Sequence, residues 1–118
     1  MIKLLKNNLY LFWKVGKYVF EKEKIVENSI DRYSKLCSYH YGSTNIFSRE
    51  NVRFMKRFYV SYPVFIPVLE NLDWEHYVEL LRISDRRKQY FYFRLAHFCR
   101  ISVDCLKSVI DNNFYENI

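Results

Sequence analysis

The chain has 118 residues, of which 50% are hydrophobic and 19% aromatic. This composition excludes an intrinsically disordered protein and predicts one compact domain over residues 1–118. The formal net charge is +6, an excess that favours a polyanionic partner without specifying one. Only two glycines and two prolines are present, so we expect an all-α fold of about six helices joined by short connections.

The positive charge is concentrated in three stretches. Residues 1–24 hold six lysines and two glutamates, a net charge of +4, while residues 47–61 reach +3 and residues 82–100 reach +5. An acidic stretch at 70–79 lies between the last two, and the tail from Ile101 is net acidic. We therefore expect separate basic and acidic regions on the surface.

Several classes of protein are disfavoured by what the sequence lacks. Cys37, Cys99 and Cys105 are widely spaced without a C-x-x-C pattern, which favours reduced thiols in a reducing compartment. The histidines do not cluster with them, so no metal is expected. The basic N-terminus has an interrupted apolar core and no cleavage site, and no stretch is long or apolar enough to span a membrane. We expect a cytoplasmic protein without cofactor, small-molecule ligand or membrane association.

The first predicted helix covers residues 2–24, where apolar residues recur at helical spacing. Its apolar arc extends past one face, so the helix lies at the centre of the domain or has a second partner. Gly16 in mid-helix marks a close helix crossing. Ser29 is expected to cap a second helix that ends near Tyr41, with Gly42 as its left-handed C-terminal residue.

Four further helices are predicted from their caps and breakers. Ser48 is expected to cap a helix from Arg49 to about Tyr62, which Pro63 terminates. An extended linker then leads to three more helices at 74–82, 85–100 and 102–112. Their predicted caps are Asp73, then Ser84 or Asp85, and finally Ser102.

The helix at 49–62 carries the first candidate site. Its cations Arg49, Arg53, Lys56 and Arg57 follow i, i+4, i+7, i+8 spacing and form one stripe. A helix, a glycine-containing turn and a serine cap precede it, which is the layout of a helix-turn-helix DNA reader. We predict that the four cations contact phosphates of double-stranded DNA, and that Arg49, Asn51 and Arg53 reach base edges.

An ordinary solvent-exposed helix face explains this stripe about equally well, because long basic side chains commonly cover apolar surface. The connection from Gly42 to Phe47 is also longer than the usual three or four residues. A second helix–turn–helix arrangement around Ser102 has a more typical turn. Its second helix is net acidic and thus a poor phosphate binder, so we expect packing there.

Arg86, Arg87 and Lys88 form the second candidate site, in the first turn of the helix at 85–100. Cations at that end oppose the helix dipole, yet together with free N–H groups they form a phosphate-binding end. Pairing with an acidic side chain explains the cluster equally well. The candidate acids are Glu70, Glu75 and Glu79.

Four segments together resemble the N-terminal domain of YhcG-like proteins, a helical domain of unknown function that precedes a PD-(D/E)XK-type nuclease domain. They are LYLFWKVGKYVFEKE, IFSRENVRFMKRFYVSYP, LDWEHYVELLRI and ISVDCLKSVIDNNFYE, and the resemblance that they carry in this order extends over nearly the whole chain. The residues that match the family's recurrent positions are Trp13, Val15, Gly16, Phe47, Ser48, Asn51, Val52, Met55, Phe58, Tyr59, Leu72, Trp74, His76, Tyr77, Ser102, Val103 and Leu106. Asp73 stands where that family usually has serine.

The resemblance implies a helix-turn-helix-like domain that binds DNA or a partner. The chain stops about where the nuclease domain would begin, and none of its ten lysines follows an acidic residue by two positions, as that metal-dependent site requires. We expect a non-enzymatic DNA-binding domain. The alternative is a protein-interaction or oligomerisation module, either a partner of a separate nuclease chain or a homodimer that forms through Leu4, Leu11, Val15 or Val19.

Overall fold

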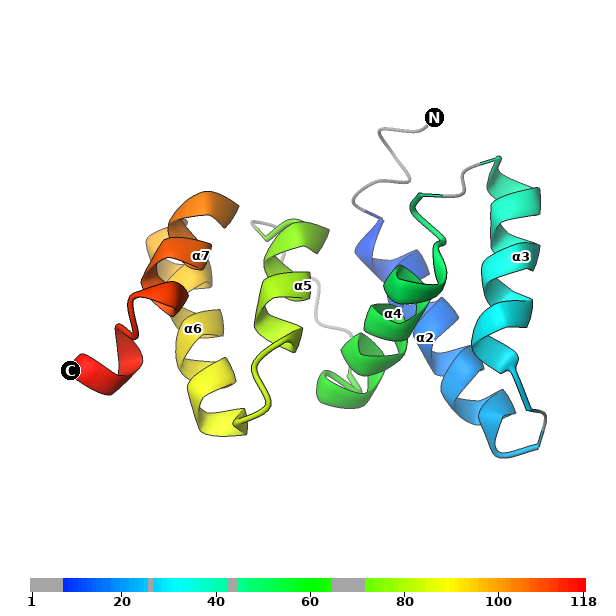
Figure 1. The fold of residues 1–118 in the computed structure, drawn as a ribbon, viewed down its shortest axis with the longest axis horizontal. Coiled ribbons are helices and arrows are strands. Elements are labelled where there is room, and N and C mark those ends of the chain that lie inside the picture. Colours follow the sequence, from blue (N-terminus) through cyan, green and yellow to red (C-terminus); the bar gives the residue numbers. More distant parts are fainter. Residues whose placement is uncertain (1–7, 26, 43–44, 65–71) are drawn as a thin grey trace. The chain divides into compact units, whose positions relative to one another are not determined.

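The computed structural model describes residues 8–25, 27–42, 45–64 and 72–118. These residues form six α-helices and one short 3-10 helix, with no strand among them (Figure 1). The expected all-α fold is confirmed. The chain divides into two compact units, residues 1–65 and residues 66–118, each with helices of its own.

Unit 1 contains α2 (Leu9–Glu23), α3 (Ser29–Tyr41) and α4 (Arg49–Ser61). Helix α3 runs back along α2, as Figure 1 shows. The side chain of Asn8 accepts a hydrogen bond from the Leu11 N–H and caps α2.

Two predicted helix boundaries in unit 1, at Gly42 and Ser48, are confirmed. Gly42 ends α3 with φ of 69°, and the Ser48 hydroxyl accepts from the Asn51 N–H at the start of α4. The expected Ser29 cap is wrong. Asn28, in the left-handed region at φ 61°, occupies the cap position without a side-chain hydrogen bond, and Ser29 is the first helical residue. Ser29 is buried, so its side chain faces the interior.

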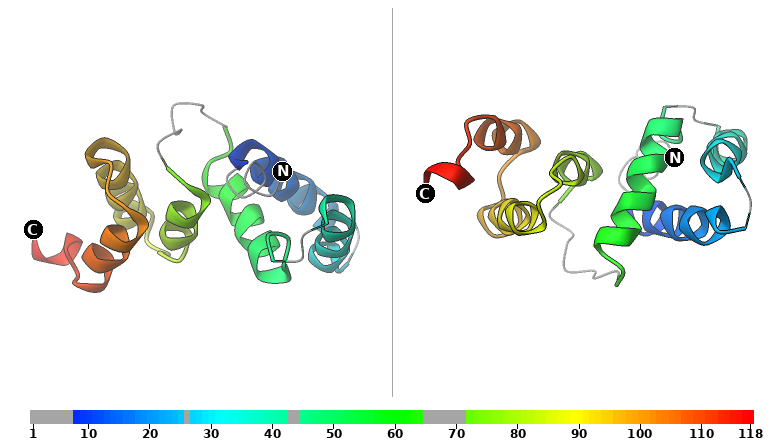
Figure 2. Two further views of the ribbon diagram at one scale, coloured as in Figure 1. Left: turned by 90° about the horizontal axis from the view of Figure 1, so that it is seen from above. Right: turned by 60° about the horizontal axis from the view of Figure 1, so that its bottom comes forward.

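The core of unit 1 forms where α4 crosses α2 (Figure 2). Gly16 lies at this crossing, because a Cβ atom there would overlap the backbone carbonyl of Met55. The predicted close approach is confirmed. The buried apolar side chains of the unit are Phe12, Val15, Val19, Cys37, Phe47, Val52, Phe54, Met55 and Phe58.

This packing corrects one expectation about self-association. Val15 and Val19, predicted at a homodimer contact, are buried inside unit 1, so they are not available to a second copy. Leu11 is partly exposed. Leu4, the extended linker at 65–71 and residues 43–44 of the predicted turn lie outside the described residues.

Hydrogen bonds and ring contacts fix the connection into α4. The Ser34 hydroxyl donates to the Phe47 carbonyl at 2.6 Å. The Phe47 ring stacks on Tyr41 and meets Phe12 edge-on. The loop before α4 is therefore held to both α2 and α3, which sets where the basic side chains of α4 emerge.

Unit 2 contains α5 (Trp74–Leu81), α6 (Arg86–Cys99), α7 (Val103–Asp111) and the 3-10 helix η2 (Tyr115–Asn117). The right-hand view of Figure 2 shows α5, α6 and α7 nearly end-on. Their buried apolar residues are Leu72, Trp74, Tyr77, Leu80, Leu81, Tyr92, Ala96 and Leu106.

The predicted caps of unit 2 are confirmed. Asp73 is the N-cap of α5. The Asp85 carboxylate caps α6, and the Ser102 hydroxyl accepts from the Cys105 N–H at the start of α7. Arg100, in the left-handed region at φ 52°, turns the chain between α6 and α7.

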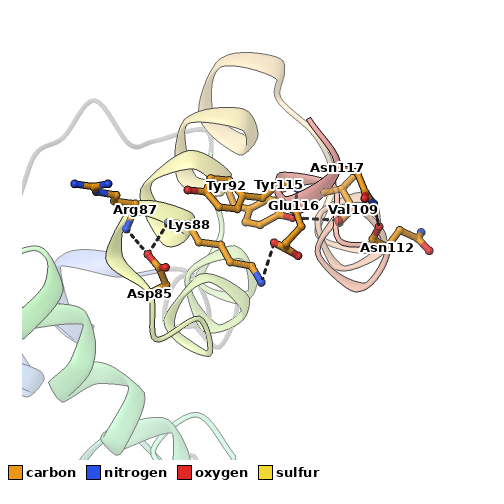
Figure 3. Close-up of polar contacts among 9 residues, drawn as sticks. All are labelled: Asp85, Arg87, Lys88, Tyr92, Val109, Asn112, Tyr115, Glu116 and Asn117. Carbon is orange, nitrogen blue, oxygen red and sulfur yellow. Dashed lines mark hydrogen bonds and ion pairs between the residues drawn. The ribbon is translucent and has the colours of Figure 1, made fainter.

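Two buried polar side chains form hydrogen bonds that connect separate segments of unit 2. The Nδ1 atom of His76 accepts from the Asp73 N–H at 2.9 Å, so the hydrogen of the neutral ring is on Nε2, which donates to the Ile101 carbonyl at 2.9 Å. The Tyr92 hydroxyl accepts from the Tyr115 N–H and donates to the Val109 carbonyl (Figure 3). His76 therefore connects the start of α5 to the turn before α7.

Candidate nucleic-acid interface

The outer face of α4 presents two guanidinium groups to solvent. Arg53 and Arg57 are exposed, and neither forms an ion pair within the described residues. The Arg57 guanidinium lies 5.5 Å from the centre of the Phe54 ring, which orients it along the helix surface. These two side chains are free to contact an anion.

The other two cations of the predicted stripe are held by unit 1 itself. Arg49 pairs with Asp31 of α3, and Lys56 pairs with Glu23 at the end of α2, with N–O distances of 2.5 Å in both cases. Both pairs are partly exposed, so each contributes less than about 1 kcal/mol. A phosphate at either position would have to compete with a carboxylate.

Asn51 faces the loop before α4. Its side-chain amide donates to the Asn45 carbonyl at 3.1 Å, and its backbone N–H donates to Ser48. These bonds stabilise the start of the helix. We therefore leave Asn51 out of the candidate interface.

The start of α6 differs from the predicted phosphate-binding end. The Asp85 carboxylate accepts from the N–H groups of Arg87 and Lys88 at 2.9 and 3.2 Å (Figure 3). These two N–H groups are satisfied, so the expectation that they are free for a phosphate is wrong. The carboxylate also offsets the unfavourable interaction of the cations with the helix dipole.

Of the acidic partners expected for this cluster, Glu75 and Glu79 are wrong, and Glu70 lies outside the described residues. Lys88 pairs with Glu116 near the C-terminus at 3.2 Å, whereas Glu79 lies near Arg82 and Lys107. Figure 3 shows Lys88 extending toward Glu116 and Arg87 pointing away from it. Arg86 and Arg87 are exposed and form no ion pair within the described part of the chain.

A further cation on α6 was missed from the sequence. Arg94 is exposed, and its guanidinium lies 5.7 Å from the ring centres of both Tyr90 and Phe98. These rings are 58% and 69% exposed, so the cation and the rings form an open surface. The spacing of four residues from Arg86 through Tyr90 and Arg94 to Phe98 is visible in the sequence and places all four on one helix face.

Other kinds of site find little support in the described part of the chain. It contains no group of three histidine, cysteine or acidic side chains able to hold a metal ion. Burial raises the pKa of the Cys37 thiol, which makes it a weaker nucleophile. None of the described helices is long and apolar enough to cross a membrane.

The chain matches the DUF1016 N-terminal domain over residues 3–117. It belongs to this family. No curated protein and no solved structure matches the chain. The match to the DUF1016 N-terminal domain extends across both units.

Most positions that carry the resemblance noted above are interior positions of this DUF1016 N-terminal domain. The buried positions in unit 1 include Phe47, Val52, Met55 and Phe58. Those in unit 2 are Leu72, Trp74, His76, Tyr77 and Leu106. These residues account for the fold. The candidate contacts lie on other residues of α4 and on α6, which carries none of these positions.

Proposed function

We propose that this DUF1016 N-terminal domain is a non-enzymatic DNA-binding domain that engages the phosphate backbone through exposed arginines on α4 and α6. On these two helices, five guanidinium groups are exposed without an ion pair to another described residue. This is the observation that carries the proposal. The arginines are Arg53, Arg57, Arg86, Arg87 and Arg94.

The reason is electrostatic. Arg49, Lys56 and Lys88 already lie near carboxylates. An arginine that lacks such a partner can bind a phosphate without breaking an existing pair, and its fork of N–H donors matches phosphate oxygens. Counterion release from DNA adds to the affinity for each phosphate neutralised.

The order of elements in unit 1 supports α4 as the helix that meets the DNA. Helix α3 and the following loop precede it, in the order of a helix-turn-helix unit. Arg53 lies in the first half of α4 and Arg57 one turn later. In the proposed complex both bind phosphates along a groove.

The test is a comparison of double charge reversals. Arg53→Glu combined with Arg57→Glu, and Arg86→Glu combined with Arg87→Glu, should each lower affinity for duplex DNA at least tenfold while the helical circular-dichroism signal is retained. Arg32→Glu combined with Lys35→Glu on exposed positions of α3 is the matched control, because it changes the net charge equally. An equal loss in the control would show that only net charge matters and would contradict the proposed site.

We further propose that the domain works with a PD-(D/E)XK-type nuclease domain on a separate chain. The support is the resemblance to YhcG-like proteins described above. Adding the isolated domain to such a nuclease should direct cleavage to DNA that the domain binds. Cleavage that is unchanged in rate and position would contradict this association.

A second candidate function is protein interaction or oligomerisation. It is favoured by large apolar side chains that α2 and α3 expose, notably Tyr18 and Leu36. Both functions can reside on one domain, since α4 and α6 carry the arginines of the proposed DNA interface while α2 and α3 carry this apolar surface.

A further inference from the structure

Helices α2 and α3 enclose a groove that the proposed DNA interface does not use. Its volume is about 380 Å³. Leu11, Val15 and Tyr18 line it from α2, and the α3 side is largely apolar as well. The residues that α3 and its C-terminus contribute are Tyr33, Leu36, Cys37, His40 and Tyr41.

The groove continues toward the other end of the helix pair. A second concavity of about 260 Å³ is lined by Lys22, Ser29 and Arg32 and shares Tyr33 and Leu36 with the first. The two together follow most of the length of α3. A surface of this length suits a helical segment better than a small molecule.

The apolar floor of the groove is accessible. Leu36 is 61% exposed and Tyr18 is 47% exposed, while Val15 and Cys37 below them are buried. The described residues of α4 contribute nothing to its lining. Covering such side chains with another apolar surface is favourable by about 25 cal/mol per Å².

The rim of the groove is cationic. Lys14, Lys22 and Arg32 line it, and no carboxylate does so among the described residues. The nearby acids Glu23 and Asp31 pair instead with Lys56 and Arg49 of α4. Within the described residues, Lys14, Lys22 and Arg32 form no ion pair, so the groove lining itself carries positive charge.

We infer that the α2–α3 groove binds an acidic amphipathic helix of a partner protein. The apolar stripe of that helix covers Leu36 and Tyr18, and carboxylates beside the stripe pair with Lys14, Lys22 and Arg32. This assignment gives a chemical class to the partner in the interaction function proposed above, and it does not depend on DNA binding. Duplex DNA is disfavoured here, because placing its charged phosphates against an apolar surface is unfavourable.

The test uses two synthetic helical peptides of about 18 residues. Both carry leucine at every third or fourth position, and the flanking residues are glutamate in one peptide and lysine in the other. Each is titrated into the ¹⁵N-labelled protein. We expect the glutamate peptide to bind at least tenfold more tightly than the lysine peptide and to shift amide signals of α2 and α3.

Two variants locate the binding. Leu36→Gln should weaken the glutamate peptide at least fivefold. Val60→Gln, at a 45% exposed position of α4, is the matched control and should leave its affinity unchanged. Because neither substitution removes an exposed arginine, DNA binding measured on the same samples should stay the same, so failure of this inference is separable from failure of DNA binding.

Several results would overturn the inference. They are equal affinity for the two peptides, no binding of the glutamate peptide at about 1 mM, amide shifts confined to α4 or unit 2, or equal loss in both variants. Occupation of the groove by duplex DNA would overturn it, as would self-association that Leu36→Gln abolishes, since the natural occupant would then be a nucleic acid or a second copy of this chain.

Discussion

Gly16 of α2 lies directly against the backbone carbonyl of Met55 in α4, and no side chain fits between the two helices at this point. Because the obstructing atoms belong to a helix backbone, they cannot move without separating the helices. The contact fixes the depth at which α4 packs and hence the orientation of its exposed arginines.

Gly16→Ala should therefore destabilise unit 1. The added methyl group forces α2 and α4 apart, and overpacking of this kind costs about 1–3 kcal/mol. Urea unfolding followed by circular dichroism measures the loss. Gly42→Asn is the control, because Gly42 has φ of 69° and open space where a Cβ atom would lie, and asparagine tolerates that conformation. A loss for Gly16→Ala no larger than for this control would contradict the close crossing.

His76→Ala should destabilise unit 2. It removes the acceptor for the Asp73 N–H and the donor to the Ile101 carbonyl, two partly buried hydrogen bonds, and the loss of two such bonds costs about 1–3 kcal/mol. Denaturant midpoints give the difference. Substituting alanine at the exposed His40 should change stability by less than about 0.5 kcal/mol. If the two variants were equally stable, the role assigned to His76 would be wrong.

Asp31→Asn should strengthen DNA binding. The substitution releases Arg49 from its carboxylate partner, so the Arg49 guanidinium becomes available to a phosphate. An exposed pair is worth up to about 1 kcal/mol, which corresponds to at most roughly a fivefold gain in affinity. Fluorescence anisotropy at low salt measures the gain. An unchanged or lower affinity would place Arg49 away from the DNA.

Cys37 should react with iodoacetamide more slowly than Cys99 and Cys105, because it is buried while they are exposed. Burial raises the pKa of the Cys37 thiol, so less thiolate forms at a given pH. Since the folded-state pKa exceeds the unfolded one, the native state should lose stability as pH rises above the ordinary thiol pKa. Mass spectrometry after timed alkylation checks the order of reaction, and early modification of Cys37 would contradict it.

Features that depend only on residues close together in the sequence were predictable from it. The Ser48, Asp85 and Ser102 caps depend on one side chain and the next turn of helix. Asn28 was missed because nothing local distinguished it from Ser29. Asn28 adopts its left-handed conformation in the turn between α2 and α3.

The candidate site was only partly predictable, because ion pairs join residues far apart in the chain. Spacing placed Arg49 and Lys56 on one stripe with Arg53. It could not show that Asp31 and Glu23 would meet two of these cations. The tail likewise returns to α6, where Glu116 meets Lys88. Only the folded chain distinguishes paired cations from exposed, unpaired ones.

DNA binding by the exposed arginines is tested most directly by anisotropy of a labelled duplex titrated at several salt concentrations. Neutralising about five phosphates predicts that the logarithm of the binding constant falls with the logarithm of salt concentration with a slope of roughly −4.5. The slope should become shallower by about two in the Arg86→Glu, Arg87→Glu variant. No binding at low salt, or binding insensitive to salt, would contradict the proposed function.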